Sequence, residues 1–386
     1  MAPRWGSGDE RGWALRQVAG ALACTADVHV VTPQGARRRD ELDGVFTVHA
    51  MASARPANIE TRRDLLIAAL GERGSAPSGP GIDAADAGAL LEDDAPWEPS
   101  VSIVEALRPD LVVLAGHTDV GSLRVCERVC PGVPLIVVPL VTDARTLALA
   151  HFAPIFERAQ AVLVFTDAEQ GAVAGRYPTV PVHRVGLPMG ANPSVQREPN
   201  TYLGERQYAL VVTGGLFDDS SWPSTLARVL GARFPQRYVA VSALDRLAVF
   251  HDGEIVETDA VERGTDLLRL VAWARMMVDL RPGTLFARRC VESLHYATPI
   301  VVPGSSCGRE HAELGAGGLW FEGPSDLTGC VEALFDSATA GALGQQGKAY
   351  AELHYGTTES FMTRVATAVG PAMGGSLSTA QRAEKH

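Results

Sequence analysis

The sequence lacks a long apolar run, an excess of positive charge and a dense set of cysteines. Apolar runs such as Leu111–Ala115 and Leu135–Val138 have the length of β-strands, whereas a membrane span needs about 20 apolar residues. Lysine and arginine total 34 against 45 aspartate and glutamate residues, a formal net charge of −11, which argues against a broad cationic face for nucleic acid. Six cysteines in 386 residues are too few for a disulfide framework. We therefore expect the protein in the reducing cytoplasm.

Targeting segments and common catalytic motifs are also missing. The N-terminal segment MAPRWGSGDERGW has no apolar core, so neither a secretory signal nor a transmembrane segment is predicted, and peripheral contact with a membrane stays open. Gly-x-Ser-x-Gly, Walker A and His-Glu-x-x-His motifs are absent, which removes the common hydrolase, NTPase and zincin classes.

Candidate metal ligands are weak. Cys126 and Cys130 lie on a predicted helix without a second Cys or His pair at metal spacing, which favours core packing over zinc. The acidic pairs Asp93–Asp94 and Asp218–Asp219 are candidates for a metal, but their acidic loops are typical of solvated turns. We therefore predict no metal site.

The sequence does contain an alternation of short β-branched runs with amphipathic segments. Hydrophobic residues make up 46% and charged residues 20%, a globular composition. Continuous apolar runs indicate strands covered on both faces, and their alternation with helices predicts βαβ units around parallel sheets. Strands are predicted at Val28–Val31, Val45–Val48, Leu111–Ala115, Leu135–Val138, Ala161–Phe165, His183–Val185, Ala209–Thr213, Tyr238–Val241, Glu254–Val256, Met276–Leu280, Ile300–Val302 and Leu319–Phe321. Helices are predicted at Arg11–Ala23, Arg63–Leu70, Val101–Leu107, Ser122–Val129, Thr146–Glu157, Trp222–Leu230, Thr265–Ala274, Arg288–Tyr296 and Leu327–Phe335.

The length suggests two domains at roughly 150 residues each. Gly186–Leu203 is rich in Pro, Gly and Asn and is predicted to be the hinge between them. We place an N-terminal domain at 1–190, a C-terminal domain at 196–360 and a helix end and tail at 361–386. The predicted helix Glu359–Ala368 is expected to pack back across the hinge.

Two segments depart from this pattern. Gly71–Pro99 is rich in Gly, Ala, Pro and acidic residues, which favours a mobile surface insertion over an ordered acceptor lid. The glycine-rich turn at Trp5–Gly8 has no apolar strand before it. Either the true start lies upstream of Met1 or the sheet is built abnormally, and we favour the first. Gly6 and Gly8 are predicted to let an acceptor or the donor phosphates approach backbone N–H groups.

The most informative segment is Met276–Gly318, a predicted strand, Pro-Gly turn, helix, strand and Gly/Ser loop. The turn at Arg281–Leu285 presents the N–H groups of the next helix, which form an anion site. Arg288 and Arg289 lie in the first helical turn, where a cation opposes the dipole unless an anion compensates. They are either solvated, or one of them meets a diphosphate together with Arg281.

Glu292 lies one turn further along the same predicted helix. A carboxylate there can accept hydrogen bonds from both hydroxyls of a ribose while the helix start holds the phosphates. A lone glutamate on a helix is usually solvated. Glu292 is flanked by the apolar residues Val291 and Leu294 and precedes a strand that is predicted to be buried, and this setting favours a functional role.

The segment VESLHYATPIVVP, which contains Glu292, resembles the second-glutamate block of GT-B fold glycosyltransferases of the family-four type. In that family a Glu-x7-Glu pair binds the nucleotide sugar, in a pattern that runs E-G-F-G, three residues, then L-E-A-M-A-x-G-T-P-V-V. By this resemblance Glu292 holds the ribose of a nucleoside diphosphate sugar. Further matches to the pattern are Phe286, Thr298, Pro299, Ile300 and Val301.

The resemblance extends over most of the chain. PRWGSGDERGWALRQVAGAL is similar to the family's N-terminal glycine loop, and VHRVGLPMGAN is similar to its inter-domain segment. ALVVTGG resembles the strand that opens the C-terminal domain, and GAGGLWFEGPSDLTGCVEALF resembles the closing block. The resemblance implies an α/β fold of two doubly wound, Rossmann-like domains that face each other across a cleft.

The donor-binding pattern departs from the family at two points. Thr284, next to Gly283 in the turn, stands where the first glutamate is expected. The basic pair expected after Gly214–Gly215 is missing, since LFDDSSW holds no Lys or Arg. We predict that Arg281, Arg288 and Arg289 substitute for it. A further candidate, His311, either contacts the donor or caps a helix.

Catalytic candidates lie in the N-terminal half. Many relatives carry a histidine at the position of Leu140, so we consider Asp143 close by and His117 at the end of the preceding predicted strand. His117 either contacts a sugar or acceptor, or is a loop-tip histidine satisfied by local hydrogen bonds.

The resemblance implies a hexosyltransferase-type glycosyltransferase that acts with retention. It would take a nucleoside diphosphate sugar as co-substrate, bound by residues 196–360, and an unidentified acceptor, bound by residues 1–190, without a cofactor. One alternative is a catalytically silent GT-B protein that binds nucleotide sugar or a partner. Another is an epimerase or phosphorylase; phosphorylases of this fold need a pyridoxal-binding lysine, and Lys348 and Lys385 lie near the chain end, which disfavours that class.

Overall fold

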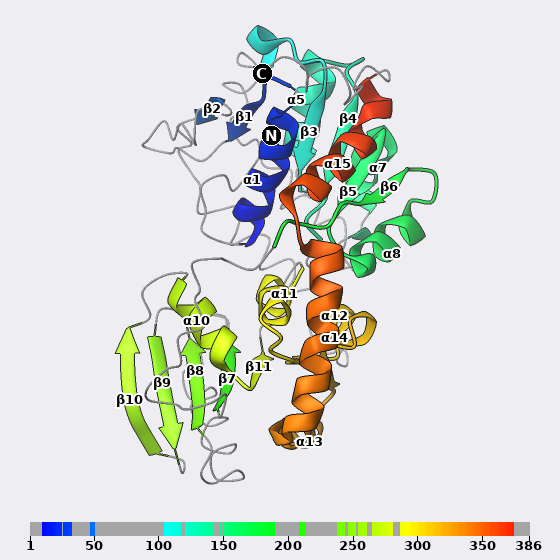
Figure 1. The fold of residues 1–386 in the computed structure, drawn as a ribbon. Helices are drawn as coiled ribbons and strands as arrows, with labels where there is room; N and C mark the ends of the chain where they lie inside the picture. Colours follow the sequence, from blue (N-terminus) through cyan, green and yellow to red (C-terminus); the bar gives the residue numbers. More distant parts are fainter. Residues whose placement is uncertain are drawn as a thin grey trace, which may run out of the picture. The chain divides into compact units, whose positions relative to one another are not determined.

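The computed structural model divides the chain into two compact α/β units (Figure 1). The first comprises Met1–Leu187 with Glu359–His386, and the second comprises Pro188–Thr358. For the described residues between 208 and 267 only the backbone is described. The described residues are 10–24, 26–32, 47–50, 104–116, 120–141, 147–148, 150–189, 208–213, 238–243, 246–251, 254–260, 265–280 and 286–373.

The strands of the first unit are all parallel within its described part. β1 (His29–Thr32) pairs with β2 (Thr47–Ala50). A second sheet has four strands in chain order, β3 (Val112–Ala115), β4 (Leu135–Val138), β5 (Ala161–Val164) and β6 (Val182–Arg184). Every residue of β4 and β5 is buried. Because such strands are covered on both faces, their sequences show continuous apolar runs, and the predicted strand positions agree to within two residues.

The helices of this unit are α1 (Glu10–Ala23), α5 (Val120–Val129), α7 (Ala153–Arg158), α8 (Asp167–Arg176) and α15 (Thr358–Val369), with short 3-10 turns at Ala150–Phe152 and Gly370–Met373. The prediction of one helix over Thr146–Glu157 is wrong. Pro154 lies in the first turn of α7, where proline is tolerated although it cannot continue a helix. On α15, Arg364 donates from Nε to the carbonyl of Val185, at 2.6 Å, and so holds this helix beside the chain that leaves β6.

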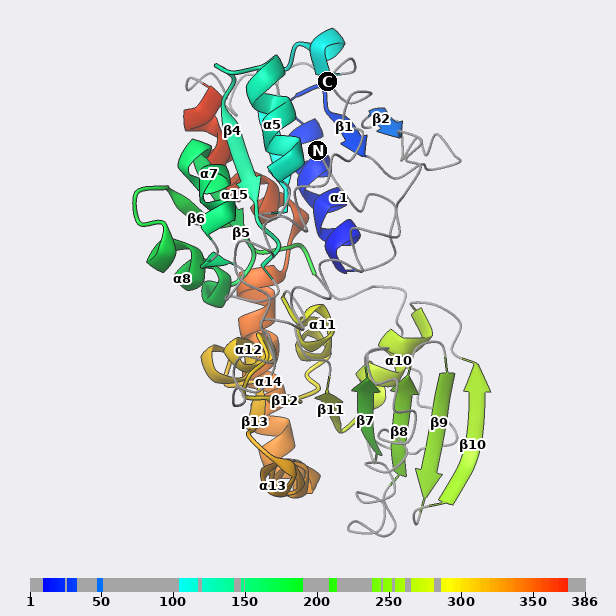
Figure 2. The same ribbon diagram turned by 180° about the vertical axis from the view of Figure 1, so that it is seen from behind.

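The second unit has a seven-stranded mixed sheet in the order β10-β9-β8-β7-β11-β12-β13. Figure 2 shows β7 to β10 side by side. The strands are β7 (Tyr208–Thr213), β8 (Tyr238–Ala243), β9 (Arg246–His251), β10 (Glu254–Ala260), β11 (Met276–Asp279), β12 (Ile300–Pro303) and β13 (Gly318–Phe321).

The predicted parallel arrangement does not extend to one edge of this sheet. β9 pairs antiparallel with both β8 and β10, and β9 itself was not predicted. Its connections, 244–245 and 252–253, are two residues long, and a connection of that length can join only antiparallel strands. Asp252–Gly253 is the strongest short-range hairpin signal.

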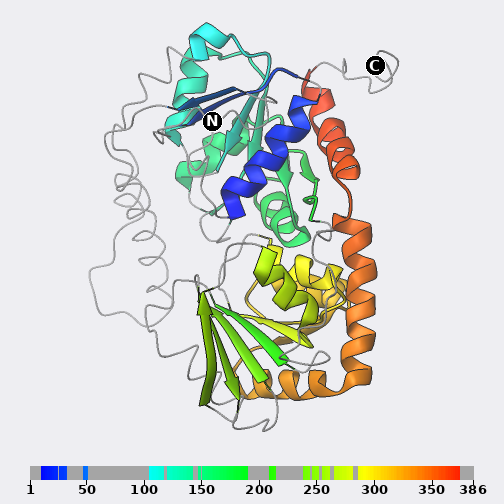
Figure 3. The same cartoon turned by 60° about the vertical axis from the view of Figure 1, so that its left-hand side comes forward.

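The helices of the second unit are α10 (Thr265–Trp273), α11 (Arg288–His295), α12 (Gly308–Leu314), α13 (Pro324–Phe335) and α14 (Ser337–Tyr355). α13 and α14 meet at a sharp corner (Figure 3). Asp336 forms this corner, and its carboxylate accepts a hydrogen bond from Thr339 N at 2.8 Å, which lowers the pKa of that carboxyl group. None of the helices in the described part of the chain is long and apolar enough to cross a membrane.

Candidate functional site

The predicted donor-binding segment lies after the carboxyl end of β11. Asp279, the last residue of this strand, is 3% exposed, and its Oδ2 accepts a hydrogen bond from Cys290 Sγ on α11 at 3.6 Å. This contact ties α11 to the end of β11. The predictions for Arg281, Gly283 and Thr284 lie outside the described residues.

The turn that enters α11 is in a strained conformation. Ala287, the N-cap, has φ +44° and is 1% exposed, and a left-handed conformation costs an L-residue about 1–2 kcal/mol. The family pattern has glycine at this position and at Ala297, which follows α11 with φ +54°. In this chain two alanines therefore adopt left-handed conformations at positions where the resembled pattern has glycine.

Glu292 is clamped between two arginines at the start of α11. Its Oε1 lies 2.8 Å from Arg288 Nε and its Oε2 lies 2.7 Å from Arg289 Nη1. The Glu292 side chain is 8% exposed, and the arginine side chains are 26% and 21% exposed. The interpretation of Glu292 as a solvated side chain is therefore wrong. The two arginines are partly exposed, and their contact with a diphosphate stays a prediction.

This arrangement can still bind an anion and two hydroxyls. An ionised carboxylate has about four acceptor sites, so the two ion pairs leave acceptor capacity on Glu292. Two guanidinium groups and one carboxylate leave one net positive charge at the positive end of a helix. The same side chains therefore provide hydroxyl acceptors and attraction for a nearby phosphate.

His311 lies on α12 and is fully buried. Its Nε2 is 3.0 Å from the carbonyl oxygen of Phe286, and its Nδ1 is 3.3 Å from Tyr350 Oη. Both ring nitrogens thus face protein groups, which favours a supporting role over the predicted contact with the donor.

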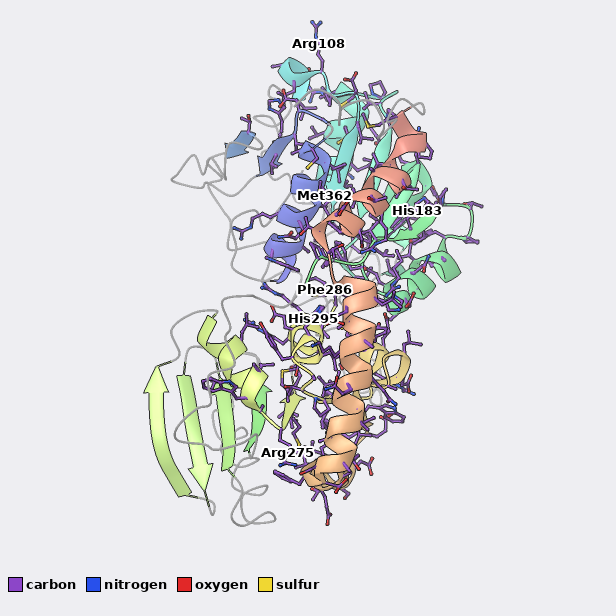
Figure 4. The ribbon with its side chains drawn as sticks, in the orientation of Figure 1. Arg108, His183, Arg275, Phe286, His295 and Met362 are labelled. Carbon is purple, nitrogen blue, oxygen red and sulfur yellow. The ribbon has the colours of Figure 1, made fainter. Side chains whose placement is uncertain are left out.

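His295 lies at the last turn of α11 beside α14 (Figure 4). It is 4% exposed, and its Nε2 has no hydrogen-bond partner among the residues that the structure describes. Burial lowers the pKa of this imidazole, while the carboxylates of Glu352 and Glu292 oppose the shift and Lys348 adds to it. The burial of this histidine was not predicted, because nothing in a helical apolar pattern marks a polar side chain as buried.

In the first unit, the loop after β4 is held by Glu169. Its carboxylate accepts hydrogen bonds from Val141 N at 3.0 Å and Phe165 N at 2.9 Å, and the residue is 4% exposed. We did not predict this role. The signal was Thr166-x-x-Glu169, since Thr166 Oγ1 caps α8 by accepting from Glu169 N.

Leu140, which the resemblance aligns with a histidine of many relatives, lies in this loop. It is 6% exposed with φ +53°, so an apolar side chain is buried here. His117, Asp143, Gly6 and Gly8 lie outside the described residues, and their predicted roles stay predictions.

The cysteine pair at the end of α5, with Cys126 in the helix and Cys130 just after it, packs in the core, as predicted. Cys126 and Cys130 are each 7% exposed, and Cys130 clusters with Val31, Val104 and Val125. Burial raises the pKa of the Cys130 thiol. The pairs Asp93–Asp94 and Asp218–Asp219 lie outside the described residues.

Comparison with known proteins gives matches among solved structures alone, since no protein-family model and no curated protein sequence matches the chain. Sucrose-phosphate synthase from Thermosynechococcus elongatus is 12% identical with a TM-score of 0.63, over 95% of this chain and 94% of that chain. The N-terminal domain of Candida albicans trehalose-6-phosphate phosphatase is 10% identical with a TM-score of 0.62, over 96% and 94%. HepE of Anabaena, in complex with UDP and glucose, is 14% identical with a TM-score of 0.60, over 95% and 97%. The predicted GT-B fold is thereby confirmed.

Proposed function

We propose that the chain is a glycosyltransferase that moves a sugar from a nucleoside diphosphate sugar to an acceptor. The observation that carries this proposal is the buried Glu292, clamped by Arg288 and Arg289 at the start of the helix that follows β11. Open α/β sheets bind ligands outside the carboxyl ends of their strands. Residues 196–360 would bind the donor, and residues 1–190 would bind the acceptor.

Glu292 would accept hydrogen bonds from the two hydroxyls of the donor ribose. Its ion pairs with Arg288 and Arg289 hold both carboxylate oxygens in place, so little ordering remains to be done when the ligand binds. Because the 2′ hydroxyl is half of this contact, the site should prefer ribonucleotides to deoxyribonucleotides.

The leaving diphosphate would meet the start of α11. Glycosyl transfer places new negative charge on the leaving group, and preorganised donors that meet this charge lower the barrier. Arg288 and Arg289 supply guanidinium donors, and we propose that Arg281, Gly283 and Thr284 complete the donor site. Neither a metal nor a cofactor is part of this proposal.

On the acceptor side we propose His117 and Asp143 as catalytic candidates, with Gly6 and Gly8 approaching the acceptor or the donor phosphates. HepE binds UDP and glucose on the same fold, which supports a UDP-hexose as the donor. A hexosyltransferase activity with retention of configuration is the specific form of the proposal.

A catalytically silent binding protein is the second candidate. The buried Leu140 favours it, since an apolar side chain at the position of the family's histidine cannot exchange a proton or accept a hydrogen bond. Such a protein would still bind the nucleotide sugar through Glu292.

A thermal-shift panel with UDP-glucose, GDP-mannose and dTDP-glucose tests the proposal. A ligand at about 100 times its Kd stabilises the folded protein against unfolding by about 2.7 kcal/mol, so binding is readily detected. We expect a shift with a ribonucleotide sugar and a smaller one with dTDP-glucose, whose nucleoside carries a deoxyribose without the 2′ hydroxyl. Donor hydrolysis that is lost in Glu292→Ala identifies an enzyme, and a shift without turnover identifies the silent binder. The absence of any shift would contradict both.

A further inference from the structure

His311 connects three elements of the second unit through one fully buried ring. From α12 its Nε2 lies 3.0 Å from the carbonyl oxygen of Phe286, and its Nδ1 lies 3.3 Å from the hydroxyl of Tyr350 on α14. The ring also meets the ring of Tyr355 edge-on, at 5.4 Å between centroids and 90° between planes.

The chemistry of these partners determines the tautomer. A carbonyl oxygen only accepts, so Nε2 must carry the hydrogen in the bond to Phe286. In the neutral ring Nδ1 is then an acceptor, and the hydroxyl of Tyr350 donates to it. The network therefore runs from Tyr350 through His311 to the backbone of Phe286.

The carbonyl that His311 holds belongs to the turn that starts α11. Ala287 follows directly with φ +44°, and its carbonyl accepts from Cys290 N at 2.8 Å and from Val291 N at 3.2 Å. A left-handed alanine needs the surrounding structure to hold it. The hydrogen bond from His311 to Phe286 fixes the peptide just before this residue.

The other side of the ring is also anchored. Tyr355 ends α14 and is 1% exposed, and its carbonyl accepts from Met189 N at 2.9 Å. Met189 is next to Pro188, where the second unit begins. His311 is thus held by residues at the boundary of this unit while it holds the start of α11.

We propose that His311 is a positioning residue for the donor site: its Nε2–H holds the Phe286–Ala287 turn and thereby the first turn of α11, from which Arg288, Arg289 and Glu292 project. This inference rests on the proposed function. His311 itself does not contact the donor.

Two substitutions separate positioning from packing. In His311→Gln the amide nitrogen reaches the place of Nε2 and can still donate to Phe286. In His311→Asn the shorter side chain reaches only the place of Nδ1. Both remove the ring and its contact with Tyr355, so their shared loss of packing cancels in the comparison.

The measurements are the Kd for UDP by isothermal titration and the melting temperature without ligand. We expect His311→Gln to bind UDP within about threefold of the wild type and His311→Asn to bind about tenfold more weakly, as expected when one lost hydrogen bond no longer holds the start of α11. His311→Asn should also melt at a lower temperature than His311→Gln, because it leaves the carbonyl of Phe286 without its buried donor. Equal Kd values for wild type and His311→Asn would overturn the inference alone. A Kd for His311→Gln as weak as that of His311→Asn would overturn it too, because a packing role predicts that result.

Two further outcomes complete the test. If wild-type protein does not bind UDP or any nucleotide sugar of the panel, the proposed function fails and the inference fails with it. If His311→Asn does not fold, nitrogen NMR of wild-type protein with labelled histidines tests the inference, because it shows which ring nitrogen of His311 carries the hydrogen. We expect hydrogen on Nε2 of His311, and hydrogen on Nδ1 alone would overturn the inference.

Discussion

The carbonyl of Ala297, just after α11, occupies the space that a side chain on Gly344 of α14 would need. One turn earlier, Gly341 has open space around it. The close approach of α11 to α14 therefore depends on the missing side chain at Gly344, whereas Gly341 only lowers the helix propensity of α14.

These two glycines make a matched pair of substitutions. Gly341→Ala should stabilise the second unit by about 1 kcal/mol, because alanine is the better helix former. Gly344→Ala should destabilise it by about 1–3 kcal/mol, because α14 or the backbone at Ala297 must shift. Differential scanning calorimetry checks both. Equal effects of the two substitutions would contradict the packing described for α11 and α14.

Glu169 should be required for the loop after β4. In Glu169→Gln one carboxylate oxygen becomes an amide that cannot accept, so either Val141 N or Phe165 N loses its buried partner. We expect a loss of about 1–3 kcal/mol in the free energy of unfolding of the first unit. The control is Glu157→Gln on exposed α7 surface, with an expected change within about 0.5 kcal/mol. A loss as small as the control's, measured by urea unfolding, would refute the role of Glu169.

His295 should make the second unit less stable at acidic pH. Its pKa is lowered in the folded state, so the unfolded chain binds the proton first as pH falls below about 6.5. The contribution of the neutral His295 ring to the free energy of unfolding is complete above this unfolded-state pKa. It is lost as the pH falls from there to the lower pKa of the folded state. The charged groups that face His295 are Glu352, Glu292 and Lys348.

The measurement is urea unfolding at pH 7.5 and pH 5.5. His295→Gln cannot titrate in this range, so its loss of stability between the two pH values should be smaller than that of the wild type. An equal loss in both proteins would show that the burial of His295 does not contribute to the pH dependence.

Much of the fold could be predicted from periodicity, and the failures have identifiable causes. β4 and β5 are buried along their whole length, so their continuous apolar runs located them. β9 was missed because it pairs antiparallel with both neighbours, so its evidence is the Asp252–Gly253 hairpin turn and not an alternation of strand and helix. α14 was missed because glycines at 341, 344 and 347 lower its helix propensity, although two of them serve packing.

The candidate site was predictable in part. Spacing alone put Glu292 one turn after Arg288 and Arg289, and pairs at i, i+3 and i, i+4 are neighbours on a helix. Whether such a group is solvated or buried depends on what packs over the helix, which local sequence does not reveal. The support from His311 was hidden for the same reason, since 25 residues separate it from Phe286.

The most direct test of the central claim is a binding cycle on Glu292 and the ribose. UDP and 2′-deoxy-UDP are titrated calorimetrically into wild type and Glu292→Gln. Glu313→Gln is the control, because Glu313 makes an i, i+4 ion pair with Arg309 at 2.7 Å on the exposed face of α12. The melting temperature of each variant is checked without ligand.

We expect wild type and Glu313→Gln to bind UDP equally and to bind 2′-deoxy-UDP about tenfold more weakly. Glu292→Gln should bind UDP about 10–100-fold more weakly than wild type, as expected for hydrogen bonds to a charged group, and should not distinguish the two nucleotides. Unchanged UDP binding in Glu292→Gln, or a tenfold preference for UDP that persists in it, would contradict the assignment of Glu292 to the donor ribose.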